Sequence, residues 1–565
     1  MPIAGRWAGG IDGRSAWGIN SPGKFLNYSM LQDNLLLIIS LLFAVTMLSM
    51  LSDKLGISYP IFLVIAGLLI SLFPGVPRIM IDPDIIFIIF LPPLLYSAAW
   101  NTSWQDFWRW RRPIGLLAFG LVICTAGVVA WVSHRMIPGF PLALGFLLGG
   151  IVSPPDAVAA TSVLQSLKVP KRVVTILEGE SLINDASSLI VFRFAMVAMV
   201  TGQFVLWKAG VEFALVSIMG IAIGLFIGVG IYLIHRWLPT TPSIDTGISL
   251  IAPYLMYITA EHFHFSGVLA VVSGGLFGSY RSHDSLTYNS RLQANSVWSV
   301  LIFLLNGVVF ILIGLQLPAI VKGLGEYSLG SAILYGIVIS LVAIVIRIVW
   351  VFPSAYLPRI CFKKIRMREP RPEEKMVFII GWSGMRGIVS LASALAIPYT
   401  LAPETAFPHR NLILFITFVV ILFTLVLQGL SLPLLVRRLK LEVQENEEEQ
   451  QLGIRLRLAT AVLDHITEQY GDEATSIDAF NRLKERYERM VQITSKKLEK
   501  EEGREENPSF LPRYRQLLLE LVDVQRKELS KMRHDKLYPE ELLRGKEFEL
   551  DLEEARFRRT GVRAK

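Results

Sequence analysis

The sequence predicts an all-α polytopic membrane protein followed by a charged helical tail. Of its 565 residues, 53% are hydrophobic and 18% are charged, a composition that excludes a disordered chain and is unusual for a soluble enzyme. Long apolar segments recur as far as about residue 438, and each is close to the ~20 residues that a helix needs to cross the hydrocarbon core of a bilayer. We therefore expect membrane lipid to be the main partner of this chain.

Changes in composition divide the chain into three regions. Residues 1–33 are polar and Gly-rich without a signal-peptide pattern, so we expect a mobile tail, with Met30 as an alternative start. Residues 34–440 hold the apolar segments of a transmembrane domain. Residues 441–565 open with EVQENEEEQQ and carry apolar residues at helical spacing, which predicts a cytoplasmic helical domain. This domain either regulates the protein through an unidentified ligand or partner, or only packs and dimerises.

Thirteen segments are expected to span the membrane. They are residues 34–51, 57–75, 84–100, 113–136, 141–166, 173–201, 209–236, 246–262, 266–280, 297–317, 329–357, 376–400 and 410–437. With the N-terminus outside, the cytoplasmic loops hold dense basic clusters such as Arg359–Lys375, whereas the opposite loops hold isolated residues such as Lys322. Positive charge favours the cytoplasmic side, so we expect the C-terminus inside, in a plasma membrane. The net charge of +8 thus reflects topology and not nucleic-acid binding.

Two of the spans are interrupted. The fifth contains SPPDA and the twelfth contains GWSGMRGIVS. Helix breaks at membrane depth are tolerated only where the freed backbone faces protein or a cavity. Because the two breaks lie seven spans apart, a repeat relating them must be inverted, which predicts six spans, a linker span and six more, with the broken helices crossing at the midplane. The helix-breaking residues are Pro154, Pro155, Gly384 and Gly387.

Two aspartates converge near the middle of the bilayer. Asp156 lies roughly 15 Å before the cytoplasmic loop that joins the fifth and sixth spans, and Asp185 lies roughly 20 Å past it, at the helical rise of ~1.5 Å per residue. Ser181 shares one helix face with Asp185, and Asn184 shares another with Glu180. Hydroxyl, amide and carboxylate oxygens suit hard cations, and no His or thiolate ligands of a transition-metal site accompany them.

These carboxylates predict competition between a proton and a metal cation. Burial favours the protonated form of a carboxylic acid, whereas a nearby cation favours the ionised form. A small monovalent or divalent cation bound at Asp185 and Asp156 would therefore exclude the proton. If the site faces each side in turn and crosses only when occupied, the two species move in opposite directions. This antiport needs no cofactor, and no nucleophile–base pairing indicates an enzyme.

The other intramembrane charges are expected to be structural. An unpaired buried charge is costly, so Glu180 and Arg386 are expected to form an ion pair. Arg347 is expected to reach toward the basic cytoplasmic loop. His262 and His264 are expected at the membrane interface.

The motif GESLIND, which follows SPPDAVAA, resembles the bacterial sodium/proton exchangers of the monovalent cation:proton antiporter-1 family. Further matches are LPPLLYSAAW, SGVLAVVSGGLFG, NGVVFILIGLQL and GMRGIVSLA, which follow the family's order from about residue 84 to 400. The chain departs from the family at Ala157, where proline is frequent, and at Ser97, where many relatives carry an acidic residue.

The resemblance implies a homodimer of thirteen-helix protomers that exchanges Na⁺, Li⁺ or K⁺ for H⁺ by an elevator-like movement, with a role in pH and sodium homeostasis. It implies that Asp185 binds the ion and the proton, that Asp156 contributes to the site, and that Asn184 and Ser181 coordinate or support it. The Asn–Asp pair implies electroneutral one-for-one exchange.

Three alternative functions stand beside Na⁺/H⁺ exchange. A K⁺/H⁺ exchanger would use the same oxygens, since ion choice depends on cavity size. A cation channel would need repeated subunits or pore loops around one axis, which an internally inverted chain does not provide. A cation or pH sensor would signal through the tail, and truncation near residue 440 distinguishes it from a transporter.

Overall fold

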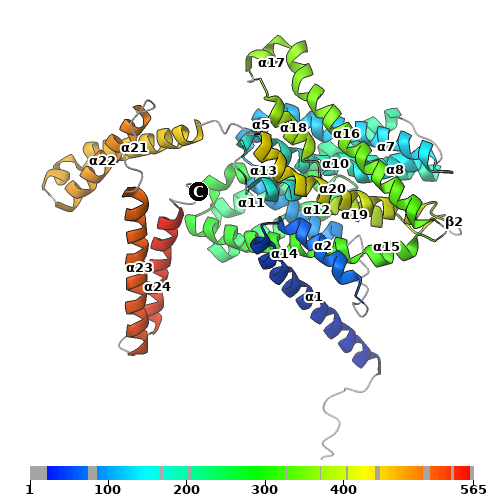
Figure 1. Ribbon diagram of the computed structural model, residues 1–565. Helices are drawn as coiled ribbons and strands as arrows, with labels where there is room; N and C mark the ends of the chain where they lie inside the picture. The colour runs from blue at the N-terminus through cyan, green and yellow to red at the C-terminus, as the bar shows by residue number, and fades with distance from the viewer. Residues whose placement is uncertain are drawn as a thin grey trace, which may run out of the picture. The chain divides into compact units, whose positions relative to one another are not determined.

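Residue contacts in the computed structural model divide the chain into two compact units, Met1–Val443 and Gln444–Lys565. The structure describes residues 22–73, 86–165, 167, 169–201, 206–325, 327–368, 371–402, 405–439, 446–476, 478–499, 510–535 and 540–559. Helices dominate both units (Figure 1). The division lies close to the change in composition at residue 441, where apolar segments give way to charged ones.

The first unit is a set of mostly apolar helices. In chain order they are α1 (Pro22–Leu55), α2 (Tyr59–Ser71), η1 (Ile86–Phe90), α4 (Leu91–Asn101), α5 (Trp104–Arg109), α6 (Arg111–Gly115), η2 (Leu116–Leu121), α7 (Val122–Met136), α8 (Leu142–Val152), α9 (Ala157–Gln165), α10 (Lys171–Thr201), α11 (Leu206–Trp237), α12 (Pro242–His262), α13 (Gly267–Ser285), α14 (Tyr288–Leu315), α15 (Leu317–Gly323), α16 (Leu329–Cys361), α17 (Lys363–Arg368), α18 (Glu374–Trp382), α19 (Ile388–Leu395) and α20 (Arg410–Leu439). The segments η1 and η2 are π-helical. An antiparallel hairpin of β1 (Thr400–Ala402) and β2 (Thr405–Ala406) lies between α19 and α20.

Among the described residues, each of the thirteen predicted ranges overlaps one helix or two or more successive helical segments. Among the described residues, eight helical segments are long and apolar enough to cross a membrane, and two shorter apolar helices accompany them. The chain is therefore a multi-pass helical membrane protein. This number is lower than the thirteen predicted spans. Several of the predicted ranges contain helices that are short, broken or more polar, such as α12 and α18.

The first helix begins earlier than the sequence predicts. Residues 1–21 of the expected tail lie outside the described residues, but α1 starts at Pro22, so residues 22–33 are helical. Proline is accepted in the first turn of a helix, where its missing N–H would have no partner. No Gly or Pro interrupts the chain between Lys24 and Leu55, so the helix continues into the apolar segment.

Close contact between α7 and α8 fixes the first broken helix. A Cβ atom added at Gly149 of α8 would lie 2.5 Å from the carbonyl oxygen of Ala126 on α7. Only glycine permits this approach, which is how small residues let apolar helices pack closely inside a membrane. The helix α8 then ends at Val152, and α9 resumes at Ala157.

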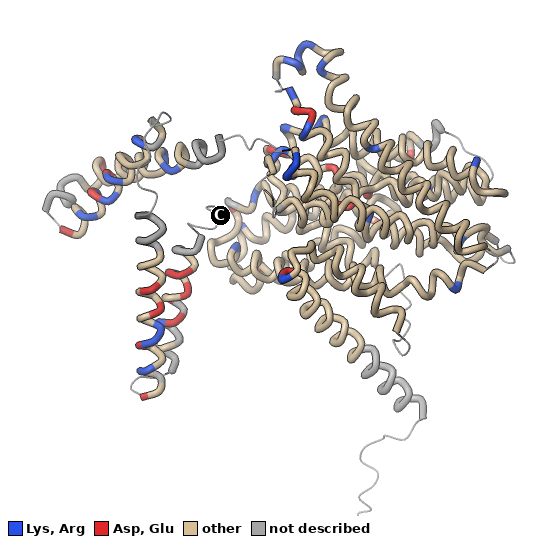
Figure 2. The backbone as a smooth tube through the Cα atoms, viewed as in Figure 1, with Lys and Arg blue, Asp and Glu red and all other residues tan. Residues whose placement is uncertain are grey.

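The second unit consists of polar helices. They are α21 (Asn446–Ser476), α22 (Asp478–Glu499), α23 (Phe510–His534) and α24 (Glu540–Arg559). Tyr470 of α21 stacks on Phe480 of α22, with 5.9 Å between ring centroids. Arg526 of α23 pairs with Asp551 and Glu554 of α24, at 2.5 and 2.6 Å. Figure 2 shows that charged residues are dense along these helices and sparse along those of the first unit.

Candidate ion-binding site

The two helix breaks meet. The first separates α8 from α9, and the second separates α18 from α19. The backbone N–H of Asp156 in the first break donates to the carbonyl oxygen of Met385 in the second, at 2.7 Å. From the second break, Nε of Arg386 donates to the carbonyl oxygen of Val152, at 3.0 Å. Backbone groups that lose their helical partners at one break therefore find new partners at the other, as intramembrane breaks require.

Backbone amides hold the carboxylate of Asp156. The N–H of Val158 donates to its Oδ1 at 2.8 Å, and the amides of Ala159 and Ile388 stabilise its negative charge from nearby. Val158 and Ala159 lie in the first turn of α9, and Ile388 is the first residue of α19. Because helix N-termini carry partial positive charge, the ends of two half-helices stabilise the negative charge of Asp156.

A glycine makes room for that carboxylate. A Cβ atom added at Gly387 would lie 1.8 Å from Oδ2 of Asp156. No side chain fits at that distance, so glycine is needed here for a close approach rather than for an unusual backbone angle. The sequence prediction that Gly387 interrupts the helix is consistent with this role, since α19 begins at the next residue.

Arg386 lies at a helix C-terminus, whereas Asp156 lies at helix N-termini. Its guanidinium donates to the carbonyl oxygens of Val152, the last residue of α8, and of Gly384. Carbonyl groups without helical partners make a helix C-terminus partly negative, so a cation is favoured there. The crossing thus places Asp156 at helix N-termini and Arg386 at a helix C-terminus.

Asp185, on α10, lies near the point where the two helix breaks meet. The residue is 7% exposed, and among the described residues no hydrogen bond reaches its carboxylate. Asp156 and Asp185 both line one cavity of about 430 Å³. The prediction from helical rise that these two aspartates converge therefore matches the structure.

The two polar neighbours predicted for the site contact the first break. Asn184 donates through Nδ2 to the carbonyl oxygen of Pro155 at 2.9 Å, and Ser181 Oγ accepts from the N–H of Ala157 at 3.3 Å. The other amide atom, Oδ1 of Asn184, is buried without a hydrogen-bond partner. Asn184 therefore supports the break through its amide nitrogen.

Two further cavity residues were not predicted from the sequence. Oδ1 of Asn306 on α14 and Oγ of Ser390 on α19 are buried without hydrogen-bond partners, and both residues line the cavity. An unsatisfied buried oxygen is costly unless something binds it. The signal available in the sequence was a polar residue inside an apolar span, which by itself does not show what the residue faces.

The predicted ion pair between Glu180 and Arg386 is wrong, because Glu180 binds Arg347. Nη1 and Nη2 of Arg347 donate to Oε1 and Oε2 of Glu180 at 2.5 and 2.9 Å, and both side chains are 1% exposed. Arg347 also donates to the carbonyl oxygen of Ile380. The prediction that Arg347 reaches toward the cytoplasmic loop is also wrong. The planar guanidinium of Arg347 satisfies the buried carboxylate of Glu180 with two parallel hydrogen bonds. Arg386 does not pair with Glu180 because it donates to backbone carbonyl oxygens instead.

Gly384 permits that pair to form. A Cβ atom added at this residue would lie 2.2 Å from Cδ of Arg347. Gly384 therefore serves the ion pair as well as interrupting the helix.

Comparison with known proteins identifies the family. The model of the transmembrane sodium/hydrogen exchangers matches residues 38–438. The chain belongs to the sodium/hydrogen exchanger family. A sodium, potassium, lithium and rubidium/H⁺ antiporter of Bacillus subtilis is 36% identical to this chain over 388 residues, which cover 67% of this chain and 58% of the relative. An uncharacterised Na⁺/H⁺ exchanger of Mycobacterium bovis is 31% identical over 530 residues, covering 92% of this chain and 95% of the relative.

Solved structures show the same fold. The chain aligns with the sodium proton antiporter MjNhaP1 from Methanocaldococcus jannaschii at a TM-score of 0.57 and 18% identity, covering 73% of this chain and all of the archaeal one. At that identity the likeness concerns the fold alone.

The cavity combines one carboxylate that accepts a hydrogen bond and one that does not. Asp156 is bonded by backbone amides, whereas Asp185 has no hydrogen-bond partner among the described residues. The unpartnered oxygens of Asn306 and Ser390 belong to residues of the same cavity wall. Carboxylate and neutral oxygens without donors suit a hard cation, and a free carboxylate also suits a proton.

Proposed function

We propose that this exchanger carries Na⁺ or Li⁺ in one direction and H⁺ in the other, one for one, at Asp185. The observation that carries the proposal is a buried carboxylate without a hydrogen-bond partner, facing a cavity together with Asp156. Asp156 already accepts a backbone hydrogen bond, whereas Asp185 has none, so we assign Asp185 as the group that binds either a proton or a cation. A cation bound between them excludes the proton.

Alternating exposure of this site would convert competition into antiport. We infer an elevator-like movement in which the segment carrying the crossed breaks and α10 shifts against the rest of the first unit. The arrangement expected around it is thirteen spans in a six–one–six inverted repeat, paired as a homodimer in the plasma membrane, with the N-terminus outside and the C-terminus in the cytoplasm. The proposed roles are pH and sodium homeostasis.

Exchange of K⁺ for H⁺ at the same site is the second candidate. It is supported by the Bacillus relatives, whose names include potassium and rubidium. The chain covers 58% of the length of each of these relatives, so their ion range does not transfer directly. Ser97 lines the cavity, so this position adds no fixed negative charge to the site.

Proteoliposomes containing the purified full chain test both candidates. The inside of the vesicles is made more acidic than the medium, so that protons can leave as cations enter. Uptake of Na⁺, Li⁺ and K⁺ is then compared with and without a membrane potential. We expect Na⁺ or Li⁺ uptake that a potential does not alter, because one charge leaves for each that enters. Uptake that follows the potential would contradict one-for-one exchange, and uptake of K⁺ alone would favour the second candidate.

The variant Asp185→Asn tests the site itself. Asparagine keeps the size of the side chain but cannot exchange a proton, so exchange should be lost while the thermal melting temperature stays close to that of the wild type. Asp106→Asn is the matched control, because Asp106 is exposed at the short helix α5 and should be dispensable. Normal exchange by Asp185→Asn would refute the assignment.

A further inference from the structure

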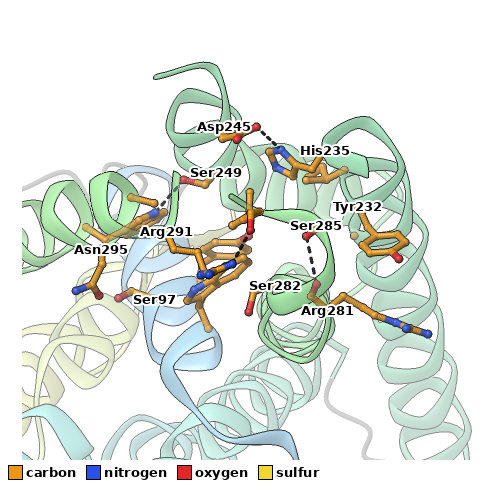
Figure 3. Close-up of a pocket in the computed structure, with 18 of the residues that line it drawn as sticks. Ser97, Tyr232, His235, Asp245, Ser249, Arg281, Ser282, Ser285, Arg291 and Asn295 are labelled. Atoms are coloured by element: carbon orange, nitrogen blue, oxygen red, sulfur yellow. Dashed lines mark hydrogen bonds and ion pairs between the residues drawn. The ribbon is translucent and has the colours of Figure 1, made fainter. Parts of the chain in front are cut away.

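A second cavity lies among α4, α11, α12, α13 and α14. Its volume is about 470 Å³, similar to the 430 Å³ of the ion cavity. Ser97 and Asn101 of α4 line both cavities. Nδ2 of Asn101 donates to the carbonyl oxygen of Ser97 at 2.9 Å, so these two residues form one local unit between the cavities. The mechanism proposed above does not use the second cavity (Figure 3).

One part of its wall is aromatic and held in place. Tyr96 packs between Trp100 and Trp298, with ring centroids 5.8 and 5.5 Å away. Nε1 of Trp298 donates to Oγ of Ser249 at 3.0 Å, which fixes the orientation of the indole. A preformed aromatic wall binds an apolar group without having to be ordered first.

The other part of the wall is positively charged. Figure 3 shows Arg291 among Ser97, Ser249 and Ser282, whereas the guanidinium of Arg281 points away from them. Arg291 donates to the carbonyl oxygen of Leu286 at 2.5 Å and has no acidic partner among the described residues. Its remaining N–H groups are available to a ligand.

The acidic residue of this wall is already engaged. Oδ1 of Asp245 lies 2.7 Å from Nδ1 of His235, and the two side chains are 4% and 7% exposed. Asp245 is thus held by His235, and it forms no ion pair with Arg291 among the described residues. The amide of Asn295 and the hydroxyl of Tyr288, both in the cavity wall, have no hydrogen-bond partners among the described residues and can donate as well.

We propose that this second cavity binds an anion in which a phosphate group is joined to an apolar body. The planar fork of Arg291 matches the oxygens of a phosphate, and Asn295 and Tyr288 can supply donors for its remaining oxygens. The N-terminal turn of α14, which carries Tyr288, adds partial positive charge. The apolar body lies against Trp100 and Trp298. The ligand is a soluble phosphate ester or the phosphate of an anionic lipid.

Binding there should affect the ion cavity, because Ser97 and Asn101 belong to both walls. A ligand that moves α4 would change the shape of the ion cavity and therefore the exchange rate. This consequence depends on the proposed exchange function, whereas ligand binding does not.

Binding is measured on the purified full chain in a neutral detergent by titration calorimetry. The probes are phenyl phosphate, benzoate and inorganic phosphate. Phenyl phosphate should bind, while benzoate and inorganic phosphate, which lack the phosphate and the apolar body respectively, should bind at least about tenfold more weakly. Arg291→Gln should weaken phenyl phosphate binding by about tenfold or more, since it removes a charge-assisted hydrogen bond. The matched control is Arg438→Gln in the last turn of α20, away from this cavity, and it should bind normally.

Unchanged binding by Arg291→Gln, or equal binding of benzoate and phenyl phosphate, would overturn the proposal. If Arg291→Gln does not fold, Ser282→Trp provides the test, because an indole would fill the cavity and should abolish binding.

Nanodiscs of phosphatidylglycerol and of phosphatidylcholine distinguish the sources of the phosphate. Weaker phenyl phosphate binding in phosphatidylglycerol alone would show that an anionic lipid occupies the site, and equal binding in both would show a soluble ligand. Na⁺ uptake with and without phenyl phosphate then tests the link to exchange separately.

Discussion

Buried charges between α10, α16 and the helix breaks are satisfied in two different ways. Glu180 and Arg347 neutralise each other through two hydrogen bonds, whereas Arg386 is bonded by backbone carbonyls. Both arginines are almost completely buried. Removing one member of a buried pair leaves the other charge without compensation, which is far more costly than losing an exposed pair.

The variant Arg347→Gln should therefore destabilise the exchanger by about 3–5 kcal/mol. Its effect is measured by thermal melting and by the yield of folded protein. Arg193→Gln is the matched control, because Arg193 forms a 2.8 Å pair with Glu261 but its side chain is 49% exposed, and the loss of such a pair costs about 1 kcal/mol or less. The double variant Glu180→Gln/Arg347→Gln should be more stable than Arg347→Gln alone. Similar losses from Arg347→Gln and Arg193→Gln would argue against a structural role for the buried pair.

At the second break, the position of α19 next to Asp156 depends on Gly387 having no side chain. The carboxylate of Asp156 reaches the N-terminus of α19 only because Gly387 lets it approach. Gly381, in the last turn of α18, is in a different position, since a Cβ atom there would lie no closer than 3.4 Å to its nearest neighbour, Cα of Ile348.

The variant Gly387→Ala should lower the exchange rate by at least about tenfold, equivalent to ~1.4 kcal/mol, because the added methyl group displaces the carboxylate of Asp156. Gly381→Ala should exchange ions at close to the wild-type rate. Both are measured as initial Na⁺ uptake into proteoliposomes with matched protein content. If the two variants behave alike, the close approach at Gly387 is not important for transport.

At the scale of the whole molecule, the two units differ in composition and in contacts. The site and both helix breaks lie in the unit Met1–Val443, whereas Gln444–Lys565 is a set of charged helices with its own internal contacts. Units with separate contacts can act independently.

A chain truncated after Val443 should therefore retain Na⁺/H⁺ exchange within about twofold of the full-length rate, since its site is complete. Exchange is measured across a range of pH in proteoliposomes, so that a regulatory contribution from the tail would appear as a shifted pH profile. Loss of exchange by a truncated protein that still melts cooperatively would show that the tail is part of the transport machinery.

The sequence by itself predicted the class of fold, the two helix breaks and the convergence of Asp156 with Asp185. These features follow from local physics, because apolar length sets a span, proline and glycine interrupt helices, and a fixed rise per residue sets depth. GESLIND and its companion motifs were also sufficient to indicate the family, because each is a short pattern of neighbouring residues.

Only the tertiary structure decided which buried groups are partners. The sequence analysis paired Glu180 with Arg386, whereas the bidentate geometry between α10 and α16 selects Arg347. The same holds for the amides that bond Asp156 and for the unpartnered oxygens of Asn306 and Ser390. Pairing depends on distances between segments far apart in the chain, and hydropathy and helical periodicity describe only what is near in sequence.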